Sequence, residues 1–274
     1  MSRDASAIVL AGNGTNCEME TAFACKSAGF ERVDIVTIWE LIAGDKTIGG
    51  YDLMCLPGGF LDGDDLGSAK AQANRLLHCT VKKTGQPLFD QFLSFITSGK
   101  LVLGICNGFQ LMVKLGMLPG FDQKYSQQEM TLTHNDSGRF EDRWVWLKAN
   151  AQSPCIFTRG VGTIYLPVRH GEGKFVAKDG EALEKLKAGN LTVFSYIDAE
   201  TKEPTIKYPD NPNGSQLAIA GVCDPTGRLF GLMPHPEAYL HKTNHPRWTR
   251  ENLPEEGMGC IIFKNAYNYV KGLG

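Results

Sequence analysis

The stretch LVLGICNGFQ at residues 101–110 decides how the rest of the chain is interpreted. Its first five residues form an apolar run typical of a short buried strand, and the apolar positions of the following FQLMVKLGML recur at helical spacing. Cys106 therefore falls at a strand-to-helix turn, and glycines at positions 104 and 108 suit a tight turn where neighbouring backbone comes close. This G-x-C-x-G pattern is that of a nucleophile elbow with cysteine in place of serine.

The first 120 residues alternate between strand-like and helix-like patterns. This alternation predicts an α/β fold with a mostly parallel sheet, helices on both faces, and ligands at the carboxyl ends of the strands. The pattern predicts strands at residues 6–11, 32–38, 51–57 and 100–105, and helices at 17–29, 64–78 and 88–99.

The pattern changes after residue 130. Strand-like runs separated by Gly, Pro, Asn and Asp now follow one another, and a helix is predicted at 257–272. We expect an antiparallel or mixed extension continuous with the first sheet, so that residues 1–274 form a single domain. The runs are RWVWLKAN, TIYLPVRH, LTVFSYID, SQLAIAGVCD and RLFGLM.

The composition excludes several classes of protein. With a net charge of -2 there is no electrostatic case for binding nucleic acid or an acidic membrane. No stretch approaches the roughly 18 apolar residues of a membrane span, and the N-terminus lacks the apolar core of a signal peptide. The eight cysteines include no C-x-x-C pair, which argues against a disulfide framework and a zinc site, and favours the reducing cytoplasm.

A cysteine nucleophile needs a base, and MPHPEAYL at residues 233–240 offers the best candidate among six histidines. In an extended segment His235 and Glu237 point to the same side, so the carboxylate could orient the imidazole. The strand-like RLFGLM before them would place the pair at another strand end.

A glycine turn provides the third component, a place for the oxyanion of a tetrahedral intermediate. LPGGF at residues 56–60 follows a predicted strand. If that strand neighbours the one before Cys106, the N–H groups of Gly59 and Asn107 could converge on one oxygen. The three motifs together predict acyl transfer through a thioester, although each alone has an ordinary structural explanation.

The same motifs carry a resemblance to a known family. LGICNGFQ, LPGGF and MPHPE resemble the class I glutamine amidotransferases, which have a flavodoxin-like fold and a Cys-His-Glu triad in this order. Longer matches spread over nearly the whole chain resemble, within that family, the glutaminase of phosphoribosylformylglycinamidine synthase. These are GTNCEMET (14–21), NDSGRFEDRW (135–144), RHGEGKF (169–175), YPDNPNGS (208–215) and LMPHPEAYLHKTNHP (232–246).

The resemblance implies roles for individual residues. Cys106 would be the nucleophile, His235 the general acid and base, and Glu237 the residue that orients it. The remaining positions would surround the substrate: Gly58, Gly59 and Asn107 near the oxyanion, Gln110 beside the glutamine side chain, and Asn135 and Ser137 in a loop over its α-amino and carboxylate groups. Cys17 lies in a glycine loop near the same sheet edge, and we expect it to be inert.

The resemblance also implies the reaction and the partners. L-Glutamine would be hydrolysed to glutamate and ammonia. The ammonia would pass to a synthetase subunit that uses ATP and magnesium to convert formylglycinamide ribonucleotide to its amidine in purine biosynthesis, with a small bridging subunit as a further candidate partner. We expect neither a cofactor nor a metal in this chain, which has no G-x-x-x-x-G-K-[ST] phosphate loop.

Three other readings stay open. The chain could be a glutaminase that serves a different synthetase, since the triad is shared within the family. It could be a cysteine hydrolase or chaperone with the same sheet, or a regulatory binding subunit without activity. The tail LDGDDLGSAKA after PGGF resembles the long-chain form of the synthase, whereas the absence of the other synthase domains resembles the separate-subunit arrangement.

Overall fold

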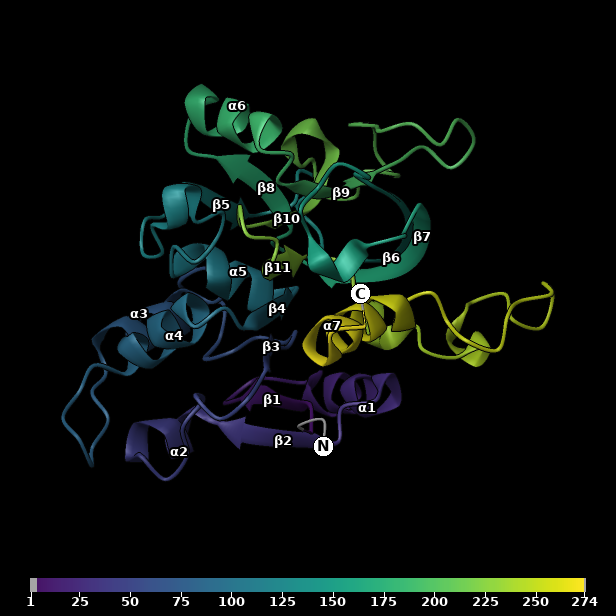
Figure 1. Ribbon diagram of the computed structural model, residues 1–274. Helices are drawn as coiled ribbons and strands as arrows, with labels where there is room; N and C mark the ends of the chain where they lie inside the picture. Colours follow the sequence, from purple (N-terminus) through teal and green to yellow (C-terminus); the bar gives the residue numbers. More distant parts are fainter. Residues whose placement is uncertain (1–3, 274) are drawn as a thin grey trace.

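The structure is a computed structural model that describes residues 4–273. Within this range nine strands form one sheet in the order β2-β1-β3-β4-β11-β10-β9-β6-β7, and β5 pairs with β8 in a separate ribbon (Figure 1). The strands are β1 Ser6–Ala11, β2 Arg32–Thr37, β3 Leu53–Leu56, β4 Leu101–Ile105, β5 Met130–Thr133, β6 Glu141–Ala149, β7 Thr163–His170, β8 Lys174–Ala177, β9 Thr192–Tyr196, β10 Ile219–Cys223 and β11 Leu229–Leu232.

The sheet has a parallel half and an antiparallel half. Strands β2, β1, β3, β4 and β11 run parallel to one another, and β10, β9, β6 and β7 continue from β11 by antiparallel pairing. β1, β3, β4 and β11 are buried along their whole length, as expected for parallel strands covered on both faces. The expected α/β fold with an antiparallel extension is confirmed.

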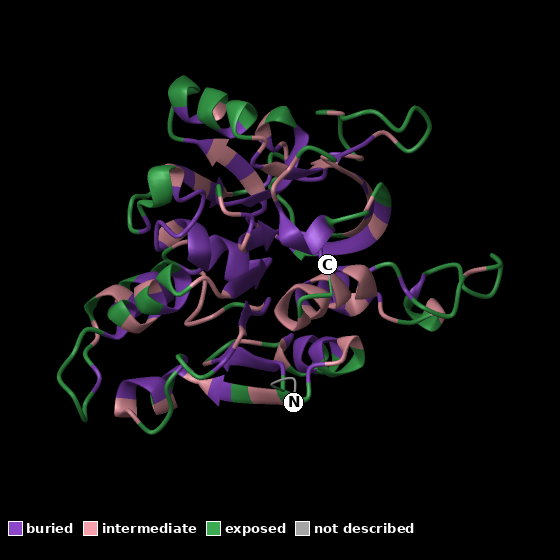
Figure 2. Ribbon diagram, viewed as in Figure 1, coloured by how far each residue is buried: buried purple, intermediate pink, exposed green. Residues whose placement is uncertain are grey.

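Helices cover both faces of the parallel half. α1 and α7 pack together on one side, and α3, α4 and α5 lie on the other (Figure 1). Figure 2 shows the buried residues concentrated in the central strands and α5, with exposed residues on the outer helices. The helices are α1 Glu18–Ala28, α2 Ile38–Ala43, α3 Lys70–His78, α4 Leu88–Thr97, α5 Asn107–Lys114, α6 Gly180–Ala188 and α7 Cys260–Lys271.

Two elements beyond the predicted set carry recognisable capping signals. α2 begins where we expected the second strand to continue, because Thr37 and Glu40 form a capping box that stops the strand at Thr37. α6 is capped by Asp179, whose side chain accepts a hydrogen bond from the Ala182 N–H. The ribbon of β5 and β8 was also not predicted.

Several predicted elements are shorter than expected. α3 begins at Lys70 rather than at residue 64, because Gly67 and Ala69 adopt positive φ angles of 96° and 61°. The run at 215–224 forms a strand only from Ile219, after a 3-10 turn. The closing helix begins at Cys260. The short 3-10 helices are η1 Phe121–Gln123, η2 Ile156–Thr158, η3 Gln216–Ala218, η4 Pro236–Ala238 and η5 Lys242–Asn244.

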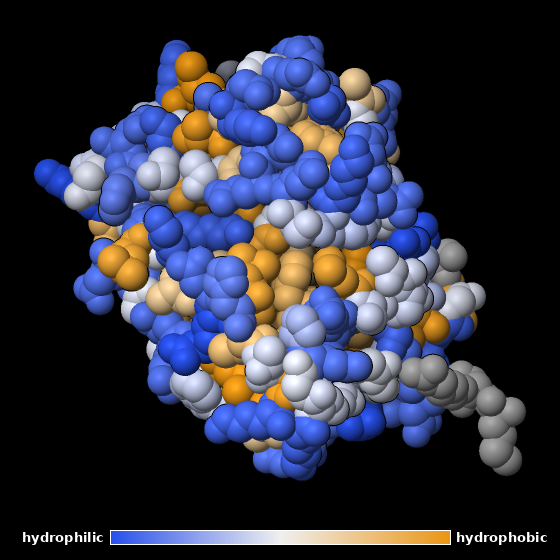
Figure 3. Space-filling view, turned by 90° about the vertical axis from the view of Figure 1, so that its left-hand side faces the viewer, coloured by the Kyte–Doolittle hydropathy of each residue, from blue (hydrophilic) through white to orange (hydrophobic). Residues whose placement is uncertain are grey.

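The carboxyl ends of the parallel strands share one edge of the molecule. β2 points to the left in Figure 1, so this edge belongs to the face turned toward the viewer in Figure 3. That face is mostly hydrophilic, with hydrophobic side chains gathered near its centre. No helix among residues 4–273 is long and apolar enough to cross a membrane. All eight cysteines are free thiols.

Candidate active site

Cys106 lies at the turn between β4 and α5, in a backbone conformation that residues other than glycine rarely adopt. Its φ and ψ are 51° and -104°. Such a conformation costs on the order of 1–3 kcal/mol and persists only where the surroundings hold it. Here the Cys106 N–H donates to the Leu232 carbonyl at 2.8 Å, and the Cys106 carbonyl accepts from the Gln110 N–H at 3.0 Å. The predicted nucleophile elbow is therefore present as a strained strand-to-helix turn.

The two glycines of the elbow are required by close packing. A Cβ at residue 108 would lie 1.8 Å from the Leu56 carbonyl oxygen, and one at residue 104 would lie 2.4 Å from the Met112 sulfur. The start of α5 thus packs directly on the end of β3. This contact brings the loop after β3 beside Cys106.

His235 and Glu237 follow the end of β11, the strand next to β4. The His235 Nδ1–H donates to Glu237 Oε1 at 2.6 Å, and both residues are buried. The two side chains are in contact as expected, but the segment that carries them is not extended as predicted. Glu237 lies in the 3-10 turn η4, which brings its carboxylate back toward the imidazole.

The charges around His235 favour its protonated form. Burial disfavours the imidazolium, but Glu237 and Cys106 outweigh burial and hold the pKa of His235 well above its usual value. Because Glu237 occupies Nδ1, the other ring nitrogen is the one that can exchange a proton with a nucleophile. That Nε2 atom is buried and has no hydrogen-bond partner within residues 4–273, and the Cys106 thiol donates to the Arg169 carbonyl at 3.6 Å.

The loop after β3 presents the glycines expected at an oxyanion site. β3 and β4 are neighbours, as the expectation required. Gly59 has a φ of 141°, and a Cβ there would lie 2.6 Å from the Gly14 carbonyl oxygen. Within the described chain neither the Gly59 nor the Asn107 N–H donates to another backbone carbonyl, so both are available to a ligand. The Asn107 side chain ties the two segments together by accepting from the Leu61 N–H at 3.1 Å.

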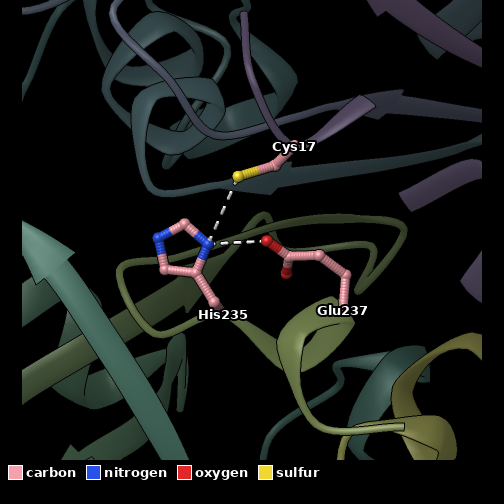
Figure 4. A group of neighbouring side chains, drawn as sticks. All are labelled: Cys17, His235 and Glu237. Atoms are coloured by element: carbon pink, nitrogen blue, oxygen red, sulfur yellow. Dashed lines mark hydrogen bonds and ion pairs between the residues drawn. The ribbon is translucent and has the colours of Figure 1, made fainter. Parts of the chain in front are cut away.

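Gly58 and Cys17 line the other side of the imidazole. A Cβ at Gly58 would lie 2.7 Å from His235 Cε1, so only glycine leaves room for the ring. Cys17 Sγ lies 4.0 Å from His235 Nδ1, and Figure 4 shows Cys17 and Glu237 both pointing toward this ring nitrogen. Burial raises the pKa of the Cys17 thiol. The sequence predicted only that Cys17 lies near the sheet edge. Its contact with His235 is seen only in the structure.

Asn135 organises the turn at residues 170–173. Its side-chain N–H groups donate to the carbonyls of His170 and Arg139 at 2.8 and 2.9 Å. Its side-chain oxygen accepts from the Gly173 N–H at 2.9 Å and from His170 Nδ1 at 3.1 Å. The side chain is therefore occupied by internal hydrogen bonds. A contact between Asn135 and glutamine stays a prediction, and it would require one of these bonds to be exchanged.

Gln110 is also engaged within the protein. Its side-chain oxygen accepts from Asn107 at 3.0 Å, and its amide N–H donates to the Glu172 carbonyl. Gln110 thus links the elbow helix to the turn at residues 170–173. A contact with the substrate stays a prediction here as well.

His170 is a buried neutral histidine beside the site. Burial, together with the charge of His235, lowers the pKa of His170 to about 3. Its Nδ1–H donates to Asn135, and its Nε2 has no partner within the described residues. The H-G-E-G segment at residues 170–173 forms the turn that closes β7.

Ser137 lies apart from this buried network, half-exposed on the loop after Asn135. It lines a cavity of about 400 Å³ together with Asp136, Arg139, Tyr208 and Asn211. Its hydroxyl accepts from the Arg139 N–H at 3.3 Å. The expected role of Ser137 above the substrate stays a prediction.

Comparison with known proteins identifies the family. The sequence profile of the CobB/CobQ-like glutamine amidotransferase domain matches residues 4–270. The chain belongs to this family. Among curated relatives, phosphoribosylformylglycinamidine synthase subunit PurQ of Methanococcus maripaludis is 44% identical, with 96% of each chain covered. PurQ of Dehalococcoides mccartyi is 43% identical, over 96% of this chain and 97% of the relative.

A longer relative and a relative of known structure also support membership of this family. Phosphoribosylformylglycinamidine synthase of Drosophila melanogaster is 35% identical, and the match covers 95% of this amidotransferase chain but 19% of that longer protein. A chain in the structure of PurLQS from Thermotoga maritima has a TM-score of 0.69 and 27% identity, with 97% of this chain and 99% of that chain covered. The expected fold and family are confirmed.

Proposed function

We propose that this chain is the glutaminase subunit of phosphoribosylformylglycinamidine synthase and supplies ammonia for purine biosynthesis. One observation carries the chemical part of this proposal. The strained Cys106 follows β4, and the buried imidazole of His235, hydrogen-bonded to the Glu237 carboxylate, follows β11, the strand paired with β4. The pathway is supported by PurQ relatives that match this chain over nearly the full length of both proteins.

The first half of the reaction forms a thioester. The Cys106 thiolate attacks the side-chain amide carbon of glutamine, and the N–H groups of Gly59 and Asn107 stabilise the resulting oxyanion. The carbon–nitrogen bond then breaks while the imidazolium of His235 gives its proton to the departing nitrogen. Ammonia leaves, and the glutamyl group stays on the sulfur.

The second half restores the enzyme. His235, now neutral at Nε2, takes a proton from water as the water attacks the thioester carbon. The carbon–sulfur bond breaks and glutamate leaves. Glu237 keeps the proton of Nδ1 in place through both halves, so Nε2 remains the atom that exchanges protons.

The partner is proposed from the chemistry of the product and from the relatives. The released ammonia contributes to biosynthesis only if a second active site consumes it. A related chain is part of PurLQS in Thermotoga maritima. We propose that a synthetase subunit, which binds ATP and magnesium, covers the mouth of this site, with a small bridging subunit as a further component. We place the protein in the cytoplasm, which suits its eight free thiols.

Apolar side chains at the rim of the site support such docking. Phe60 follows the oxyanion glycine Gly59 and is 44% exposed, and Phe140 is 53% exposed. Their ring centroids lie 6.4 Å apart. Exposed aromatic side chains of this kind mark protein interfaces more often than open surface.

The proposal is tested by following glutamate and ammonia. The purified chain is incubated with glutamine, alone and with the purine synthetase subunit and its nucleotide ligands. We expect weak hydrolysis by the chain alone, stimulation by the synthetase, and no hydrolysis by Cys106→Ser. The matched control is Cys79→Ser, which removes a half-buried thiol at the end of α3 and should keep full activity.

The outcomes separate the competing functions. Unchanged hydrolysis by Cys106→Ser would remove the proposed nucleophile. Stimulation only by an unrelated synthetase would keep the chemistry and overturn the pathway. No hydrolysis under any condition would favour a regulatory subunit, and cleavage of peptides instead of glutamine would favour a cysteine hydrolase.

A further inference from the structure

Cys17, His235 and Glu237 bring three potential metal ligands together in one buried group. Figure 4 shows the three side chains turned toward one another. One ligand atom from each lies within 4.8 Å of the others, and all three residues are buried. The Cys17 thiol donates to the side-chain oxygen of Asn16 at 3.1 Å. Its proton is therefore directed away from the imidazole, and a sulfur lone pair can face the space beside Nδ1.

The proposed glutaminase chemistry leaves part of this group unused. It needs the imidazole and the carboxylate, but it has no step for the Cys17 sulfur. The second carboxylate oxygen, Glu237 Oε2, is buried and has no hydrogen-bond partner within residues 4–273. A soft sulfur, an imidazole nitrogen and a carboxylate oxygen are together the ligand set that zinc accepts.

We propose that Cys17, His235 and Glu237 form a binding site for a thiophilic divalent cation such as zinc, and that the bound ion blocks the active site. The second part rests on the proposed glutaminase function; the binding part does not. The site differs from the elbow because it uses Nδ1 of His235, whereas the nucleophile uses Nε2.

The distances fit such an ion after small movements. Tetrahedral zinc with ligand bonds of about 2.0–2.3 Å separates its sulfur and nitrogen ligands by about 3.5 Å. Cys17 Sγ and His235 Nδ1 lie 4.0 Å apart. The carboxylate of Glu237 is closer to Nδ1 than two zinc ligands can be, at 2.6 Å, so it must withdraw or bind through Oε2. Water would fill the fourth position.

The charges of the ligands suit a buried dication. A thiolate from Cys17 and the carboxylate of Glu237 balance the two positive charges, and the imidazole binds as a neutral ligand. Ion pairing of this kind is what makes a buried charge tolerable. Cys17, 8% exposed against 2% for His235, is the ligand nearest to solvent.

The positions of the protons on His235 explain why the bound ion would stop the reaction. The metal takes the Nδ1 lone pair, so the Nδ1 proton of the imidazolium and the thiol proton of Cys17 are both released to solvent, and the proton on Nε2 remains. With Nε2 protonated and Nδ1 bound to metal, His235 cannot accept a proton from Cys106 or from water. Glu237, engaged with the ion, can no longer orient the ring.

Binding is measured in the full-length Cys106→Ser variant, which lacks the elbow thiol and should not hydrolyse glutamine. Zinc chloride is titrated against this protein in competition with a chromophoric chelator. We expect one zinc ion per chain. We expect the dissociation constant to rise by at least about a hundredfold on adding Cys17→Ser, because a direct ligand is lost. Adding Cys79→Ser, the matched control, should leave it unchanged.

A second variant covers the case in which Cys17→Ser does not fold. His235→Ala in the Cys106→Ser background should weaken zinc binding to a similar degree. Absence of one-to-one binding in the Cys106→Ser protein, or affinity that survives both Cys17→Ser and His235→Ala, would overturn the site. Inhibition is read separately: zinc should inhibit glutamine hydrolysis by the Cys79→Ser enzyme. Zinc binding without inhibition would overturn the second part alone.

Discussion

At the scale of single residues, His235 is the proposed acid and base, and its two ring nitrogens have different surroundings. Glu237 holds Nδ1 through a 2.6 Å hydrogen bond, and Nε2 is left without a partner in the described chain. An imidazole used as an acid and a base needs this asymmetry, because only one nitrogen should exchange protons with the substrate.

Replacement of the orienting carboxylate tests this division. Glu237→Gln keeps the size of the side chain but can no longer hold the Nδ1 proton as a charged acceptor. We expect kcat for glutamine hydrolysis to fall on the order of 10²–10⁴-fold with little change in KM, as for other triads that lose their acid. Glu200→Gln, on an exposed turn, is the control and should leave kcat unchanged. Equal kcat in wild type and Glu237→Gln would contradict the proposed role.

Because His170 is buried in its neutral form, it makes the free energy of unfolding fall as the pH falls. Its pKa of about 3 lies below the ordinary value of 6.5, so the unfolded chain binds the proton first as the pH falls. The stabilisation by neutral His170 is complete above pH 6.5 and is lost as the pH falls toward 3. Between pH 7 and pH 5 we expect this residue to account for about 2 kcal/mol of lost unfolding free energy.

The measurement compares urea unfolding of wild type and His170→Asn at both pH values. His235, whose pKa is raised, contributes in the opposite sense, but it is present in both proteins and cancels in the comparison. The variant should lose less stability than wild type between pH 7 and pH 5. An identical loss in the two proteins would show that His170 titrates normally.

At the scale of elements, the contact between β3 and α5 positions the site. α5 begins directly after Cys106, and Gly108 in its first turn lies against the Leu56 carbonyl at the end of β3. This contact sets how close the glycine loop after β3 comes to the elbow. The distance between the two proposed oxyanion donors therefore depends on a packing contact between helix and strand.

A methyl group at this contact should separate the two elements. In Gly108→Ala the new Cβ would meet the Leu56 carbonyl oxygen at 1.8 Å, so backbone must move. We expect a loss of about 2–3 kcal/mol in unfolding free energy and a fall of at least tenfold in glutamine hydrolysis. Gly162→Ala, where a Cβ meets nothing within 4 Å, is the control. Wild-type stability of Gly108→Ala in urea unfolding would contradict the close contact.

At the scale of the whole molecule, the parallel and antiparallel halves share one hydrogen-bonded sheet. β4 pairs with β11, β11 pairs with β10, and the ladder continues to β7. His235 lies at this junction, and the His235 N–H donates to the Pro167 carbonyl of β7 at 2.8 Å. The site therefore draws on both halves, which supports the expectation that they form a single domain.

A single domain should unfold in one step. Tryptophans report separately on the two halves, since Trp39 lies in α2 and Trp146 in β6. One variant keeps only Trp39 and a second keeps only Trp146, with phenylalanine at the other tryptophan positions. In each variant, urea unfolding followed by fluorescence should coincide with unfolding followed by far-ultraviolet circular dichroism. A separate earlier step in either variant would contradict the single domain.

Local patterns were sufficient for much of the fold. The alternation of apolar strands with amphipathic helices indicated the parallel half, and Gly104 and Gly108 marked the elbow. The signals for α2 and α6 were also present, in the capping box at Thr37 and Glu40 and the cap at Asp179. The ribbon of β5 and β8 was harder to predict, because its strands are four residues long and pair across more than 40 residues.

The reactive groups and the strand ends that carry them can be predicted from the amino-acid order alone: Cys106 after β4, the glycines after β3 and His235 after β11. Hydrophobic periodicity and turn residues are local properties, so they can be interpreted without the fold. Three further features depend on the folded chain: β3, β4 and β11 are neighbours, η4 turns Glu237 onto the ring, and Cys17 faces the same nitrogen. These contacts join residues far apart in the chain, and they arise from strand pairing and close packing, which local patterns do not encode.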